Sequence, residues 1–251
     1  MLTNILNNHL EYQPGLSIDC VIFGFHDGEL KVLLLNQNFT PKWSLPGGFV
    51  PINTDIDSAA IQVLFERTAL EGIFLKQFAT FGAVNRNQIA YNKSVLNFYD
   101  KSIPENSWFL ERYVSIGYYA LVDYMETIPQ ADNQFENIAW VDLKNLPELI
   151  LDHQLIIEKA LESLRYQLNQ MPIGYNLLPE KFTLPEIQKL YESILDKKLD
   201  RRNFLRKMNN IGILIKLSEK KDKVPHKAPH LYRFDKDKYE QVLKSGLNQG
   251  W

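Results

Sequence analysis

The sequence predicts two domains: a mixed α/β/α sandwich over residues 1–170 and a small helical domain with a β-hairpin over residues 171–251. Apolar strand-like runs alternate with helical segments in the first part, which is typical of an α/β fold. A Pro- and Gly-containing segment, residues 171–176, then separates this pattern from a pair of capped helices. Charge divides the chain in the same way, because residues 197–238 carry 14 Lys or Arg against 5 Asp or Glu, whereas the whole chain has a net charge of −2. The basic C-terminal part therefore predicts a polyanionic partner.

The strands of the first domain are predicted from apolar runs separated by turn signals. Asp27-Gly28 favours a hairpin between the first two runs. Asp152 is expected to cap a long helix that carries apolar residues at helical spacing and closes the domain. The expected strands cover residues 16–23, 30–35, 76–84, 112–122 and 136–141.

Residues 88–111 are polar and aromatic with weak periodicity, so we interpret most of the segment as an insertion or loop. Two roles are open for it. It could cover a pocket of the first domain, or it could pack against a second subunit.

Composition indicates an ordinary globular protein, with 45% hydrophobic and 23% charged residues. No apolar run approaches the roughly 20 residues that span a membrane, and the N-terminus lacks the pattern of a signal peptide. The single cysteine, Cys20, lies in an apolar strand, where a buried structural thiol is a better interpretation than a catalytic one. A cytoplasmic location is therefore expected.

The stretch from Trp43 to Leu70, WSLPGGFVPINTDIDSAAIQVLFERTAL, predicts a strand, a Gly-Gly turn and a helix capped by Asp55. This layout resembles the Nudix box, in which Gly, five residues and Glu precede Arg-Glu-aliphatic-x-Glu-Glu-x-Gly-aliphatic after a spacer of seven. Gly48, Leu64 and Leu70 match the pattern. The departures are Thr54 for the first Glu, Gln62 and Val63 for Arg-Glu, Glu66 and Arg67 for Glu-Glu, and Ala69 for the second Gly.

These departures remove the chemistry that the box normally carries. Positions 63, 66 and 67 share one helix face and would hold Mg²⁺ through carboxylate oxygens, but only Glu66 is acidic. We therefore expect no metal site, no cofactor, no catalytic residue and no enzyme activity; Glu66 and Arg67 could be ordinary surface residues. The alternative is a Nudix hydrolase of ADP-ribose or a related nucleoside diphosphate with replacement metal ligands, drawn from Asp55, Asp57, Glu66 and Glu71.

The C-terminal domain has the pattern of a winged helix-turn-helix. Thr183-Leu184-Pro185-Glu186 forms a capping box at the start of one helix. A second helix runs from an N-cap at Asp200 to Gly212, a favoured residue just beyond a helix end. Two strands follow, joined by the basic loop 220–227, which would be the wing.

The second helix buries Phe204 and Met208 and directs Arg, Asn and Lys side chains outward. Arg and Asn can bind guanine and adenine edges in the major groove, and lysines in the wing suit phosphate contacts. The alternative is a solvated basic helix that packs on something else. The predicted DNA-binding residues are Arg201, Arg202, Asn203, Arg206 and Lys207 in the helix and Lys220, Lys221 and Lys223 in the wing.

The whole chain resembles the Nudix-related transcriptional regulators, in which a Nudix-like domain is fused to a winged helix. The segments that carry the resemblance are DHQLIIEKALESL, PIGYNLLPEKFTLPEIQKLYESIL, LDRRNFLRKMNNIGIL and LYRF. The resemblance implies a DNA-binding regulator, most simply a repressor, whose Nudix-like domain senses a small molecule. The implied effector is ADP-ribose or a pentose such as L-arabinose, and the implied assembly is a homodimer on a pseudo-palindromic double-stranded operator.

Four residues are expected to bind the effector: Trp43, Glu66, Arg86 and Arg112. The two arginines match the places where the ADP-ribose-type domains carry Arg, at strand ends where they could hold an anion or sugar hydroxyls. Exposed strand-end arginines and a structural tryptophan are the alternatives. The degraded box favours a neutral sugar, because a metal that bridges phosphates lacks its ligands. A protein-interaction adaptor that binds neither DNA nor a small ligand is a weaker alternative.

Overall fold

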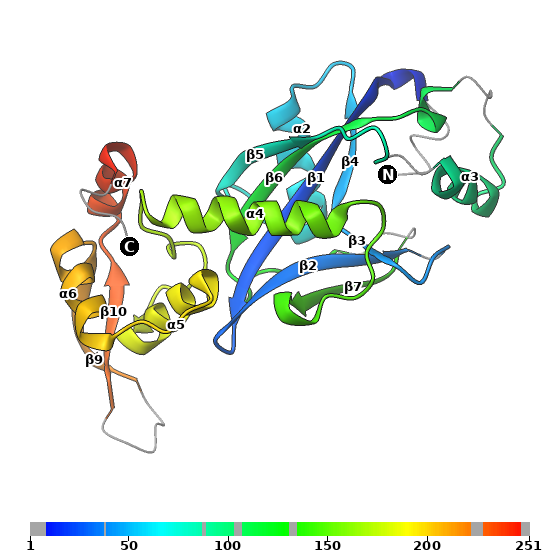
Figure 1. Cartoon of the computed structure of the whole chain (residues 1–251). Coiled ribbons are helices and arrows are strands. Elements are labelled where there is room, and N and C mark those ends of the chain that lie inside the picture. Colours follow the sequence, from blue (N-terminus) through cyan, green and yellow to red (C-terminus); the bar gives the residue numbers. More distant parts are fainter. Residues whose placement is uncertain are drawn as a thin grey trace. The chain divides into compact units, whose positions relative to one another are not determined.

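The apolar runs of the N-terminal part form one mixed sheet (Figure 1). Its strands lie in the order β3-β2-β1-β6-β5, with β4 paired to β1 and β7 paired to β2. Val21–Phe23 on β1 and Val32–Leu35 on β2 are fully buried, because helices cover both faces of the sheet. The bounds are β1 (Tyr12–His26), β2 (Glu29–Gln37), β3 (Trp43–Ser44), β4 (Gly47–Pro51), β5 (Leu75–Phe81), β6 (Val114–Val122) and β7 (Phe135–Asp142).

The structure is a computed structural model of the whole chain and describes residues 9–37, 39–86, 89–102, 107–130, 135–221 and 228–246. Contacts divide the chain into two units. The first comprises residues 1–23, 31–121 and 127–160, and the second comprises residues 24–30, 122–126 and 161–251. The boundary expected after residue 170 stays a prediction. No helix in the described ranges is long and apolar enough to cross a membrane.

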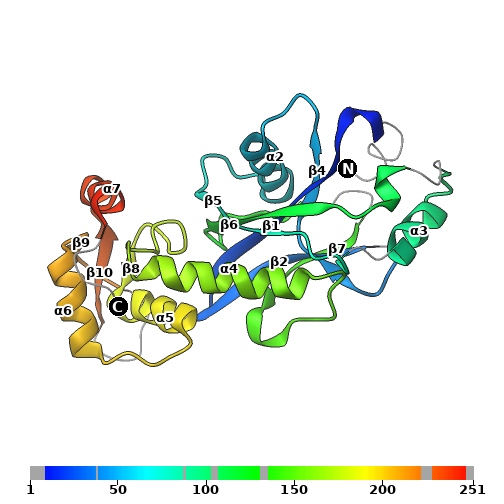
Figure 2. The same cartoon turned by 45° about the horizontal axis from the view of Figure 1, so that its top comes forward.

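Helices α2 (Ile56–Thr68) and α4 (His153–Leu168) provide the two outer layers, with α2 on one face of the sheet and the first half of α4 on the other (Figures 1 and 2). The predicted α/β/α sandwich is therefore confirmed. Asp55 is the N-cap of α2 as expected, although its side chain makes no capping hydrogen bond. Short 3₁₀ helices are η1 (His9–Glu11), η2 (Trp108–Leu110) and η3 (Leu143–Asn145).

The loop expected over most of residues 88–111 is wrong for residues 89–98, which form helix α3 (Ile89–Phe98), and the 3₁₀ helix η2 follows later in the segment. That the segment is an insertion stays a prediction. The helix buries Val95 and Leu96 against Phe109, and the Asn92 amide donates to the Phe109 carbonyl at 2.9 Å. Its apolar residues do not share one buried face, since Ile89 and Phe98 are exposed, so tertiary packing decides its conformation.

The second unit contains the predicted winged helix. Its sheet has the order β8-β10-β9, and α5 and α6 form the helix-turn-helix. The capping box is present, since Thr183 N–H donates to the Glu186 carboxylate at 2.6 Å. The bounds are β8 (Phe182–Thr183), α5 (Leu184–Leu195), α6 (Arg201–Ile211), β9 (Leu214–Lys220), β10 (His230–Phe234) and α7 (Lys236–Ser245).

Helix α7 was not expected from the sequence. The Tyr239 hydroxyl on α7 donates to the Pro172 carbonyl at 2.9 Å, and its ring lies 5.4 Å from that of Phe234. Tyr175 also contacts both rings. Helix α7 therefore holds residues 172–175 through one aromatic cluster, whose members are far apart in the sequence.

The N-cap of α6 provides a local test of stability. The Asp200 carboxylate accepts a hydrogen bond from Asn203 N–H at 2.9 Å. Replacing Asp200 by Ala is expected to destabilise the second unit by about 1 kcal/mol. Hydrogen exchange at the α6 amides would measure the loss, and Asp237→Ala, in the first turn of α7, is a control expected to leave α6 unchanged. Unaltered α6 exchange in Asp200→Ala would contradict the prediction.

Candidate functional site

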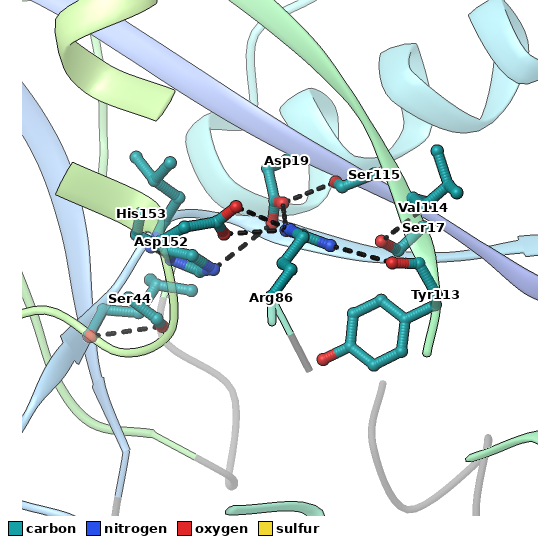
Figure 3. A network of polar contacts seen from close by, with 11 residues as sticks. Ser17, Asp19, Ser44, Arg86, Tyr113, Val114, Ser115, Asp152 and His153 are labelled. Atoms are coloured by element: carbon teal, nitrogen blue, oxygen red, sulfur yellow. Dashed lines mark hydrogen bonds and ion pairs between the residues drawn. The ribbon is translucent and has the colours of Figure 1, made fainter. Parts of the chain in front are cut away.

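An ionic cluster lies in the first unit where β1, the turn after β5 and the start of α4 meet (Figure 3). Arg86, in the turn after β5, donates from Nη2 to Asp19 on β1 at 2.9 Å and from Nε to Asp152 at 2.8 Å. The Arg86 side chain is 1% exposed. Burial lowers the pKa of Arg86, but the two carboxylates raise it by more, so the net shift is upward and the arginine stays charged. Ser115 completes the cluster by donating its hydroxyl to Asp19.

His153, the first residue of α4, adjoins this cluster. Its Nδ1 accepts a hydrogen bond from Leu45 N–H at 2.9 Å. The neutral ring must therefore carry its proton on Nε2, which lies 3.6 Å from an Asp19 carboxylate oxygen. Burial lowers the pKa of His153, and the Asp19 charge opposes this only in part. The histidine is held neutral and oriented toward Asp19.

This lowered pKa predicts a pH dependence of stability. Below the unperturbed histidine value of 6.5 the unfolded chain binds a proton that folded His153 does not accept, so stability falls as pH falls. Urea unfolding followed by tryptophan fluorescence, from about pH 7.5 to about pH 5.5, should show the decline while most carboxylates remain ionised. His153→Gln keeps an acceptor for Leu45 N–H and should flatten the slope. An equal slope in the variant would show that other groups cause it.

The cluster forms the polar end of a cavity in the first unit. Gly47 is required there, because a Cβ at this position would lie 2.5 Å from the Ile18 carbonyl and 2.8 Å from an Asp19 oxygen. Phe49 contacts Tyr113 at a ring separation of 5.3 Å on the aromatic side. The wall includes the polar residues Ser17, Asp19, Ser44, Arg67, Arg86, Asn92 and His153 and the aromatic residues Phe49, Tyr91, Phe109 and Tyr113.

The four expected effector residues occupy different places. Arg86 lines the cavity, but Trp43, Glu66 and Arg112 are not among the described residues of its wall. Trp43 bonds through its backbone to Glu148 and Ile150, and Arg112 donates to the Gly82 carbonyl at 3.0 Å in an exposed position. Glu66 accepts from the Gln62 amide on the surface of α2. The effector-binding roles of all four stay predictions.

Sequence reasoning missed Asp19, Asp152 and His153. Asp152 was interpreted only as a helix cap, but its carboxylate accepts hydrogen bonds from Arg86 Nε. A signal for Asp19 was available, because a charged residue within the buried run Ile18-Asp19-Cys20-Val21 needs a partner. No local pattern identifies that partner, which lies 67 residues away.

The residues of α2 do not fit the Mg²⁺ site of the Nudix box. Val63 and Arg67 are both buried, and Glu66 faces Gln62 at the surface instead of the cavity. Within the described ranges, no group of three or more His, Cys, Asp or Glu side chains could hold a metal ion. Cys20 is fully buried, and burial raises the pKa of its thiol, as suits a structural residue.

In the second unit, α6 separates apolar from basic residues. Phe204 and Met208 are buried, whereas Arg201, Arg202, Asn203 and Arg206 are exposed. The Arg206 guanidinium donates to the Asn203 side chain at 3.1 Å. Burial, with the nearby Lys197 charge, lowers the pKa of half-buried Lys207. In the expected wing, Lys220 is exposed, Lys221 pairs with Glu186, and Lys223 lies outside the described residues.

Comparison with known proteins identifies this arrangement. Residues 174–234 match a family model described as the NrtR DNA-binding winged helix domain. Over 235 residues, which cover 90% of this chain and 84% of the relative, the chain is 28% identical to the ADPR responsive transcriptional repressor NtrR of Acinetobacter baylyi (strain ATCC 33305 / BD413 / ADP1). Over most of its length the chain is therefore similar to the NrtR-type regulators, and its C-terminal part matches their winged helix.

Solved structures agree with this assignment. The crystal structure of Shewanella oneidensis NrtR complexed with a 27mer DNA has a TM-score of 0.71 and 26% identity, with coverage of 94% of this chain and 99% of that chain. A MutT/nudix family protein from Enterococcus faecalis has a TM-score of 0.62 and 20% identity, with 94% of each chain covered, and shows the shared fold. The NrtR-like chain thus combines a Nudix fold with a C-terminal winged helix, as the sequence predicted.

Proposed function

We propose that this NrtR-like protein is a sequence-specific, DNA-binding transcriptional repressor whose Nudix-like domain binds a small-molecule effector. The observation that carries the proposal is the exposed basic face of α6 in a winged helix of the NrtR type. The names of two similar proteins support it, since one is an ADPR responsive transcriptional repressor and the other is NrtR complexed with a 27mer DNA.

Operator recognition is assigned to α6 and the wing. Arg201, Arg202, Asn203 and Arg206 present the donors and acceptors that contact base edges in the major groove. Lys207 and the wing lysines Lys220, Lys221 and Lys223 add phosphate contacts, which raise affinity without sequence information. Two copies of the chain, related by a two-fold axis, would bind the two half-sites of the operator.

The effector is a neutral pentose, such as L-arabinose, bound in the cavity beside Asp19 and Arg86. Arg86 already directs its Nε and one Nη group to two carboxylates, so it has little capacity to neutralise a diphosphate. Carboxylates and an oriented histidine suit the hydroxyl groups of a sugar, and Phe49 and Tyr113 offer apolar faces. ADP-ribose is the second candidate, because it is the effector in the name of the Acinetobacter relative.

The proposal includes loss of hydrolase activity. With Val63 and Arg67 buried and Glu66 at the surface, α2 lacks the set of carboxylates that would hold Mg²⁺ against a pyrophosphate. The rival function is a hydrolase that uses Asp55, Asp57, Glu66 or Glu71 as replacement ligands. Release of product from ADP-ribose in the presence of Mg²⁺ would support the rival.

The first test is thermal stabilisation of the full chain by L-arabinose, D-xylose, D-ribose and ADP-ribose, each with and without Mg²⁺. A ligand that binds only the folded state raises the melting temperature. A shift with a pentose and none with ADP-ribose is expected. A shift with ADP-ribose alone would replace the sugar by the second candidate, and no shift with any of them would contradict the proposed sensor.

The second test uses a labelled DNA fragment from upstream of the protein's own gene and its neighbours. Binding should be sequence-selective, weaken with salt and change when the effector is added, because an effector that favours one conformation shifts affinity at a coupled site. Light scattering should give a dimer in solution. Salt-insensitive or sequence-independent binding would contradict the repressor function.

A further inference from the structure

The eroded Nudix helix places an arginine where the box has a metal-binding carboxylate. Arg67 stands at the second Glu of the Glu-Glu pair, is 2% exposed and lines the same cavity as Asp19 and Arg86. Val63, one helical turn earlier on the same face, is 4% exposed and offers no ligand. A buried, positively charged side chain thus lies in the part of the cavity wall where a Mg²⁺ site would need a carboxylate.

The cavity and the ionic cluster beside it carry charges of both signs. Asp19 and Asp152 carry two negative charges, and Arg86 between them carries one positive charge. His153 is neutral, because burial lowers its pKa. Arg67 adds a second positive charge to the residues that line this cavity, as a metal ion would in a metal site.

We propose that Arg67 replaces the divalent cation of the Nudix box and donates directly to a hydroxyl oxygen of the effector. This inference rests on the proposed sugar-sensing function and names a residue that determines its specificity. An arginine is always charged, is less strongly hydrated than an ammonium group and has five donors in a fixed plane. It therefore supplies permanently the charge that Mg²⁺ would supply only when bound, and effector binding requires no divalent cation.

The test is calorimetric titration of the full chain with L-arabinose, D-xylose and D-ribose, in EDTA and in Mg²⁺. The wild type should bind one of these pentoses with the same affinity in both. Arg67→Met, which keeps the length but loses the charge, should weaken binding at least about tenfold, the loss of one hydrogen bond from a charged donor. Arg67→Lys keeps the charge and should lose less.

Arg67→Glu distinguishes replacement of a cation from a merely structural role. It restores the carboxylate of the box, so it should lose pentose binding in EDTA and recover part of it when Mg²⁺ or Mn²⁺ is added. A structural role would give no such rescue. Gln62→Ala, an exposed change on the same helix, is the control, and urea unfolding followed by the fluorescence of the first unit's tryptophans shows that each variant is folded.

The outcomes separate the two proposals. Pentose binding by the wild type that needs Mg²⁺, or that is unchanged in Arg67→Met, would overturn the role of Arg67 and leave the sugar sensor intact. No pentose binding by the wild type would overturn the proposed effector and the role of Arg67 with it. If Arg67→Met fails to fold, loss of binding in folded Arg67→Lys or Mg²⁺ rescue of Arg67→Glu decides the question.

Discussion

Replacing Arg86 by Met is expected to lower the free energy of unfolding of the first unit by about 3–5 kcal/mol. The side chain is 1% exposed and bonds to both Asp19 and Asp152. Removing it leaves the buried Asp19 carboxylate and the partly buried Asp152 carboxylate without the positive charge that pairs them. The loss is therefore much larger than that of one hydrogen bond.

Urea unfolding followed by tryptophan fluorescence measures this change, since Trp43, Trp108 and Trp140 all belong to the first unit. Arg112→Met is a matched control, because Arg112 is also an arginine at a strand end but is exposed and donates to the Gly82 carbonyl. It should change stability by no more than about 0.5 kcal/mol. An equal loss of unfolding free energy in the two variants would mean that the ionic pairs of Arg86 add nothing to stability beyond what an exposed arginine adds.

The double replacement of Arg202 and Arg206 by Ala should weaken operator binding about 100-fold or more, with no change in folding. Each arginine that contacts a base edge contributes about 1–3 kcal/mol, or roughly tenfold to 100-fold in affinity. Both are exposed on α6, where neither supports the core formed by Phe204 and Met208. Discrimination between the operator and a scrambled sequence should fall together with affinity.

A mobility-shift titration over several salt concentrations measures this effect. Lys244→Ala, on the exposed surface of α7, removes a positive charge outside the proposed interface and serves as the control. It should leave both the affinity and the salt slope unchanged, whereas loss of a phosphate contact lowers the slope by about one. If the double variant retained full affinity and specificity, the assignment of α6 as the recognition helix would be wrong.

Local chemistry was sufficient to predict the winged helix. Thr183 and Glu186 cap α5, Asp200 caps α6, and Gly212 ends α6 in the left-handed conformation with φ of 73°. Each of these signals acts within four residues of chain, so the sequence contains the whole cause. Helix α7 was missed although the same kind of local signals flank it, since the Asp235 carboxylate accepts from Lys238 N–H at its start and Gly246 follows its end.

The N-terminal domain shows where local patterns suffice and where they do not. Buried runs such as Val32–Leu35 predict strands because both faces of the sheet are covered. Helix α3 was interpreted as a loop, since packing of Val95 and Leu96 against Phe109 determines it. The eroded Nudix helix was recognisable from the spacing of Gly48, Leu64 and Leu70, but the sequence did not show that Arg67 is buried in the cavity wall.

By itself the sequence determined the two folds, the absence of the box carboxylates on α2 and the basic face of α6, because each depends on residues close together in the chain. Only the tertiary structure decided which charges meet in the cavity. Asp19, Arg86 and Asp152 are separated by 67 and 66 residues, and only the sheet and the start of α4 bring them into contact. Ionic pairing over such distances leaves no periodic pattern, since any Arg and any Asp can pair once the fold places them together.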